Sequence, residues 1–153
     1  MLLRLFKYGK YAFDEMGTND INVGGTAASV LALAKGVYAQ LRSQHGVYLS
    51  GILRTKLLCY TTSVADLDFA NQIKNAKWQS GADVDTLNQS WGGTGGANTV
   101  IETHAAVADG TDPWIWATGM AGEASSPKTH LHPSPAGYTA AAVPIRAAFV
   151  ALT

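Results

Sequence analysis

A helix-like spacing of apolar residues, placed between two short apolar segments, most constrains how this chain can fold. After Thr26, a candidate N-cap, apolar residues recur every three or four positions along one helix face: Val30, Leu31, Ala34, Val37, Tyr38 and Leu41. Gly46 follows as the expected helix stop. Short apolar segments at 11–14 and 53–60 flank this helix and have the length of buried strands. A strand, a helix and a strand in this order predict a parallel pair.

The rest of the chain continues the same alternation. A helix is expected around 69–80, a third strand at 100–104 and a last helix at 135–152. Pro144 lies inside the last helix, where its missing N–H predicts a kink or a late start. The alternation predicts an α/β fold with a parallel sheet, in one domain over residues 1–153. Sites in such folds form at the carboxyl ends of the strands.

Composition excludes several classes of protein. The 153 residues carry 11 basic and 11 acidic side chains, and zero net charge argues against a nucleic-acid partner bound through its phosphates. Hydrophobic residues make up 47% and charged residues 14%, which excludes a disordered chain. No apolar run approaches the ~20 residues of a membrane span. The first residues, broken by Arg4 and Lys7, do not form a signal peptide, so no compartment is indicated. A single cysteine, Cys59, excludes an internal disulfide.

The first motif with chemical potential is Gly17-Thr18-Asn19-Asp20, which directly follows the strand expected at 11–14. The glycine permits a tight turn. An asparagine amide at a strand end can donate a hydrogen bond to a developing oxyanion, and one such donor is worth ~3 kcal/mol of transition-state stabilisation. An ordinary turn rich in Gly, Asn and Asp is the alternative interpretation.

The second motif is His132-Pro133-Ser134-Pro135-Ala136-Gly137-Tyr138, just before the last predicted helix. A histidine that prolines hold at the mouth of a helix can act as a general base, because imidazole exchanges protons near neutral pH. A helix-entry loop with a solvated histidine is the alternative interpretation.

Taken together and in this order, the two motifs resemble those of the SGNH or GDSL-type ester hydrolases. Gly17 to Asp20 match the family's Gly-x-Asn-Asp block, and His132 with Gly137-Tyr138 matches the family's ending. The resemblance implies a three-layer α/β/α, flavodoxin-like parallel sheet, with no cofactor and no metal. It assigns Asn19 to the oxyanion hole and Gly17 to the turn of the motif. His132 would be the base that takes the serine proton and later protonates the leaving alcohol.

Two parts of the family pattern are absent. No Gly-Asp-Ser block occurs, so this chain offers no serine nucleophile; Ser50 precedes an expected strand instead of following one. Thr129 stands three residues before His132, at the position of the acid, and carries no charge to stabilise an imidazolium. Carboxylates on nearby loops that could substitute are Asp109, Asp112 and Glu123.

Two functions therefore compete. The first is hydrolysis of a small-molecule carboxylic ester or of an O-acetyl group on a carbohydrate. In that case the chain is N-terminally truncated relative to the family, and we expect no serine-dependent turnover from the chain by itself. The second is a non-catalytic binding or structural module on the same scaffold. Low charge and high apolar content predict that core segments here meet a missing N-terminal segment or another subunit of a homo-oligomer. The strand at 11–14 is expected to expose an edge.

Other conspicuous residues receive simpler interpretations. A zinc site formed by His104, His130 and His132 is not favoured, because no cysteine or carboxylate accompanies these histidines at ligand spacing. Using His130 as the base would place Pro127 at the acid position. The glycines at 92–96 lack the Lys-Ser/Thr of a phosphate-binding loop and predict a flexible connection instead of a flavodoxin-like phosphate site. Tryptophans expected to pack over the sheet edge are Trp91, Trp114 and Trp116.

Overall fold

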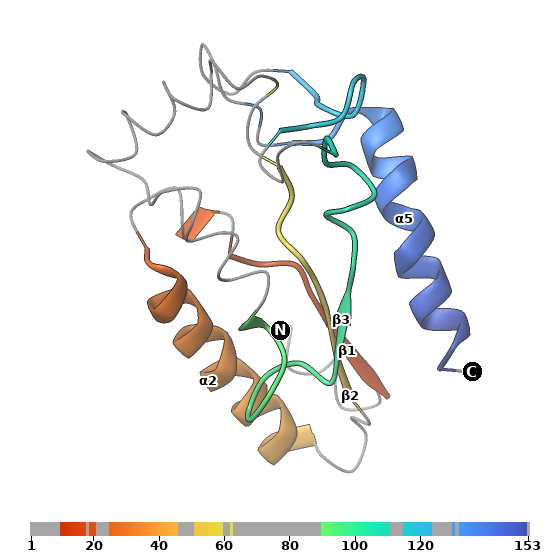
Figure 1. Cartoon of the computed structure of the whole chain (residues 1–153). Helices are drawn as coiled ribbons and strands as arrows, with labels where there is room; N and C mark the ends of the chain where they lie inside the picture. The colour runs from red at the N-terminus through yellow and green to blue at the C-terminus, as the bar shows by residue number, and fades with distance from the viewer. Residues whose placement is uncertain are drawn as a thin grey trace.

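The computed structural model describes residues 10–17, 19–20, 25–45, 51–59, 62, 90–110, 115–123, 130 and 132–152. Its labelled elements, in chain order, are β1 (Tyr11–Asp14), α2 (Ala27–His45), β2 (Gly51–Thr55), β3 (Thr99–Ile101) and α5 (Pro135–Val150) (Figure 1). Within these residues, no helix combines the length and the apolar character that crossing a bilayer requires. The helix expected at 69–80 lies outside the described residues.

The three strands form one parallel sheet in the order β1-β2-β3, which confirms the predicted α/β character. Tyr11 is level with Gly51, and Leu53 is level with Thr99. In this sheet β1 has a described neighbour on one side only, because β2 lies between it and β3. The carboxyl ends of the strands therefore lie together at one edge, where the sequence places both motifs.

The two long helices lie on opposite sides of the sheet (Figure 1). Tyr38 of α2 packs against Ala12 and Ile52, and all three are almost fully buried. Burying a side chain the size of isoleucine stabilises the fold by roughly 1.5–3 kcal/mol. Because side chains alternate along a strand, Phe13 points to the other side, where its ring lies 6.3 Å from that of Phe149 in α5.

Both long helices begin at caps that the sequence encodes. Thr26 precedes α2 as predicted: its Oγ1 accepts from Ser29 N at 3.1 Å, and Ser29 Oγ accepts from Thr26 N at 2.9 Å. Ser134 caps α5, where its Oγ accepts from Gly137 N at 3.1 Å. Such caps satisfy N–H groups that have no partner within the helix.

The late start that Pro144 led us to expect was wrong. Helix α5 begins at Pro135, without a late start, and continues through Pro144 to Val150. Pro135 occupies the first turn, where a missing N–H costs no helical bond. The cap and the buried Gly137 and Ala141 anchor the half of the helix that precedes Pro144, so one lost bond does not end it.

Two predicted strands are shorter than expected, and one loop is more constrained. β2 ends at Thr55 instead of continuing to 60, and β3 ends at Ile101, where Thr103 N turns back to donate to Ile101 O at 2.9 Å. The glycine loop at 92–96, expected to be flexible, is tied to α2 by Arg42. Its guanidinium donates to Gly95 O at 3.2 Å and to Gly96 O at 2.6 Å.

Candidate functional site

The Gly-Thr-Asn-Asp motif sits directly beyond the end of β1. Gly17 is buried and has a φ of +118°, a conformation that side chains rarely adopt. A Cβ there would lie 3.3 Å from Val30 Cγ1 and 3.4 Å from the Arg54 guanidinium. Asn19 and Asp20 follow in helical conformation and are exposed. The glycine therefore makes the turn that presents the Asn19 side chain at the carboxyl end of the sheet.

The backbone around His132 is held on both sides by a neighbouring loop. Gly122 N donates to His132 O at 2.8 Å, and Ser134 N donates to Met120 O at 2.8 Å. The Ser134 hydroxyl donates to Gly119 O at 2.6 Å. These bonds fix the backbone on both sides of His132, and its side chain is exposed.

Asn19 and His132 line the same pocket, which has a volume of about 230 Å³. Its lining residues are Glu15, Asn19, Lys56, Leu57, Leu58, Cys59, His132, Pro133 and Tyr138. Two residues far apart in the sequence therefore line one cavity. Gly17 borders a neighbouring pocket of about 150 Å³ together with Trp91. Thr129, at the acid position, lies outside the described residues.

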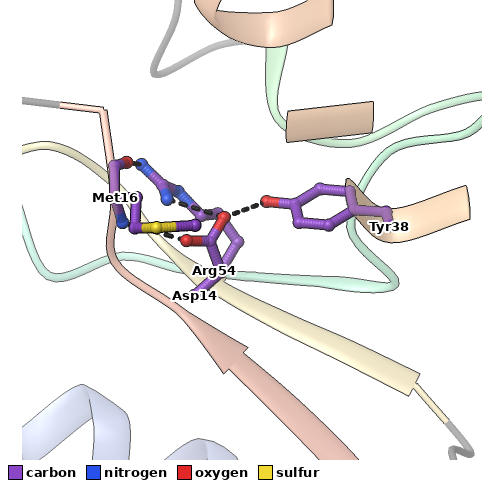
Figure 2. Close-up of polar contacts among 4 residues, drawn as sticks. All are labelled: Asp14, Met16, Tyr38 and Arg54. Carbon is purple, nitrogen blue, oxygen red and sulfur yellow. Dashed lines mark hydrogen bonds and ion pairs between the residues drawn. The ribbon is translucent and has the colours of Figure 1, made fainter. Parts of the chain in front are cut away.

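A buried ion pair that the sequence motifs did not indicate lies directly beneath the Gly17 turn. Arg54 in β2 is fully buried, and its Nη1 lies 2.8 Å from Asp14 Oδ2 in β1. Figure 2 shows Asp14 at the centre, where it also accepts from the Tyr38 hydroxyl. Arg54 donates in addition to Met16 O, and Met16 N donates to Asp14 Oδ1 at 2.9 Å. These bonds fix the backbone that leads into Gly17.

Burial changes the ionisation of this network. Desolvation lowers the pKa of Arg54, and the facing Asp14 carboxylate opposes that change. Burial, together with the hydrogen bond to Asp14, raises the pKa of Tyr38, so its hydroxyl remains a donor. Trp91 covers the guanidinium, with its ring centroid 3.7 Å from Arg54 Cζ. A sequence signal existed: each of two apolar strands carries one charge near its carboxyl end, and Asp14 pairs with Arg54 in the register.

The tryptophans and histidines in the described part of the chain do not gather at one site. Trp91 stacks on Arg54, while the buried Trp116 packs with Val107 and Ala141, and its Nε1 donates to His130 O at 2.8 Å. Trp114 lies outside the described residues. His130 Nδ1 donates to Gly122 O at 2.7 Å. Across the described ranges, no three His, Cys, Asp or Glu side chains gather as a set of metal ligands.

Beside the pocket, Lys56 forms an ion pair with Glu102. Burial opposes ionisation of Glu102, but the hydrogen bonds from Lys56 and from Ala105 N, the latter at 3.1 Å, outweigh it and lower the pKa of Glu102. A carboxylate with a depressed pKa stabilises the folded state above its ordinary pKa, and this contribution is lost as the pH falls through the lowered value.

Glu102→Gln is therefore expected to lower the free energy of unfolding at neutral pH and to have progressively less effect in acid. Urea unfolding of both proteins between about pH 7 and pH 3 measures this. Glu123→Gln is the matched control, since this carboxylate is exposed and forms no ion pair with the described residues. A Glu102→Gln effect that grows on acidification would show that the ion pair does not stabilise the fold.

Comparisons with known proteins support the fold and leave the family open. The sequence matches no protein-family model and no curated protein. A solved structure from Streptococcus pneumonia, provisionally described as a platelet activating factor, aligns with a TM-score of 0.65 at 16% identity. The alignment covers 90% of this chain and 58% of that one. At this identity the likeness shows a shared α/β fold, and this chain spans somewhat over half the length of its structural neighbour.

Proposed function

We propose that this chain carries the oxyanion and histidine portion of an SGNH or GDSL-type ester hydrolase site on a three-layer α/β/α fold. The observation that carries the proposal is the shared pocket: Asn19, from the turn after β1, and His132, from the loop before α5, line one cavity of about 230 Å³. A strand-end amide and a loop histidine around one cavity are the groups that acyl transfer needs to stabilise an oxyanion and move a proton.

The remaining lining residues suit a short acyl group. Leu57, Leu58 and Pro133 supply apolar wall, and the Tyr138 ring is exposed at the start of α5. We assign the substrate as a small carboxylic ester or an O-acetyl group on a carbohydrate. Asn19 would donate to the carbonyl oxygen as negative charge develops, and His132 would protonate the leaving alcohol. Gly17 would set the turn that holds Asn19 in place.

The sequence has no Gly-Asp-Ser block, so the proposal assigns recognition and oxyanion stabilisation to this chain and no serine nucleophile. Serine-dependent turnover of esters by the chain alone is not expected. Thr129 would stand at the acid position, where it can accept a hydrogen bond but cannot balance an imidazolium charge.

Binding of a non-hydrolysable ester analogue tests this assignment. Butyramide, followed by NMR titration, is expected to shift the Asn19 and His132 resonances together. Asn19→Ala and His132→Ala should each weaken binding about fivefold, because one hydrogen bond contributes about 1 kcal/mol. The matched control is Thr139→Ala, whose hydroxyl donates to Pro135 O within α5. Unchanged affinity in both site variants would reject the proposed role of the pocket.

A further inference from the structure

Cys59 and His104 form a thiol–imidazole pair beside the proposed site. Cys59 lies four residues beyond the end of β2, and His104 three residues beyond the end of β3. Because these parallel strands are neighbours, the two residues meet at the same edge of the sheet. The Cys59 Sγ lies 3.8 Å from His104 Nε2, within hydrogen-bonding distance for sulfur. Both side chains are buried, with relative exposures of 3% and 8%.

The pair is connected to the cavity already described. Cys59 lines the 230 Å³ pocket together with Asn19 and His132. A thiolate is the nucleophilic form of cysteine, and a histidine in contact with the thiol can take its proton. Cys59 therefore lies in the wall of the cavity whose other residues would bind an ester carbonyl, and its thiol contacts a base, His104.

We propose that the Cys59 thiol, with His104 as its base, accepts the acyl group of a small ester bound in this pocket. A bond forms between Cys59 Sγ and the carbonyl carbon of the ester. The single bond between that carbon and the alkoxy oxygen breaks. His104 takes the thiol proton, and His132 gives a proton to the departing alkoxide, which leaves as the alcohol; exchange with water then returns both imidazoles to their starting forms. The product is a thioester on Cys59, formed once per chain. The inference rests on the proposed function for the identity of the acyl donor.

A purely structural cysteine is the competing interpretation, since Cys59 also packs with Val107, Trp116 and Ala141. Buried cysteines of that kind behave as small apolar side chains and are chemically inert. The two interpretations differ in the reactivity of the folded protein, which is directly measurable.

The first experiment measures alkylation of Cys59 by iodoacetamide, a small neutral reagent, using intact-protein mass spectrometry. The folded protein should react at least as fast as the urea-unfolded protein. His104→Gln should slow the folded reaction about tenfold, because the thiolate fraction falls without a base, and should not alter the rate in urea. The matched control is His130→Gln, whose ring contacts Gly122 O instead of the thiol. If Cys59 is alkylated only after the protein is unfolded, the proposal is overturned, whatever the variants show.

The second experiment tests acyl transfer with 4-nitrophenyl acetate. One equivalent of nitrophenol should be released per chain, with the acetyl group mapped to Cys59, and Cys59→Ala should abolish both. Asn19→Ala should slow acetylation without changing the iodoacetamide rate. Alkylation of folded Cys59 without acetylation overturns the acyl-acceptor role, and the butyramide titration then judges the proposed function separately. If Asn19→Ala leaves the rate of acetylation unchanged, the oxyanion role of Asn19 is contradicted. The role of the Cys59–His104 pair as acyl acceptor then still holds.

Discussion

Asp14→Asn is expected to lower the free energy of unfolding by about 3–5 kcal/mol, because it leaves a buried cation without its counter-charge. Arg54 is fully buried, and its ion-pair partner among the described residues is Asp14, 2.8 Å away. A loss of this size is a large fraction of the stability of a domain of this length. Urea denaturation followed by far-UV circular dichroism measures it.

A triple variant separates the cost of the orphaned charge from the value of the ion pair. Asp14→Leu, Arg54→Met and Tyr38→Phe together remove the charges and the hydroxyl that bonds to Asp14. Apolar replacements of a whole buried network are often neutral, so this protein should be more stable than Asp14→Asn alone. If Asp14→Asn costs less than about 1 kcal/mol, the ion pair is solvated more strongly than its burial indicates.

Gly137→Ala is the second change with a large expected effect. Gly137 lies in the first turn of α5, where an added Cβ would overlap Met120 O and lie 2.9 Å from Pro133 Cβ. Overpacking of this kind costs about 1–3 kcal/mol. The Met120 and Pro133 backbones also hold the loop of His132, so the substitution should displace that histidine as well as destabilise the fold. Thermal unfolding and the butyramide titration measure the two effects.

Gly36→Ala provides the matched control for Gly137→Ala. Gly36 lies in α2 with no atom within 4 Å of an added Cβ. Alanine in an exposed helix position is more favourable than glycine by about 1 kcal/mol, so this variant should raise the melting temperature and leave binding unchanged. Equal behaviour of the two variants would show that close packing at Gly137 does not constrain the His132 loop.

The local elements were predictable because their signals are short-range. The spacing of Ala34, Tyr38 and Leu41 places one face of α2 against the sheet, and Thr26 caps the helix as the sequence indicated. β1 has the predicted bounds. The boundary errors have a common cause: at 56–60 and 102–104 the sequence remains strand-like, but strand pairing ends earlier. Where strand pairing ends depends on which residues lie next to the strand in the folded protein, and the local sequence does not indicate this.

The candidate site was predictable only as separate parts. Asn19 and His132 could be proposed because each lies in a motif with recognisable chemistry, and the structure places both at one pocket. The Asp14–Arg54 ion pair and the Cys59–His104 contact were not predicted, because each of these residues stands alone in the sequence. Arg54 lies 40 positions from Asp14 along the chain, and Cys59 lies 45 positions from His104.

By itself, the sequence predicted the positions of three strands and of the helices α2 and α5, the Thr26 cap, and two motifs with possible catalytic chemistry. It could do so because periodicity and capping act over a few residues. Only the tertiary structure decided that Asp14 faces Arg54, that Cys59 meets His104, and that Asn19 and His132 share a cavity. The physical reason is the parallel sheet: its register aligns the carboxyl ends of strands from distant parts of the chain, and chemistry depends on that alignment.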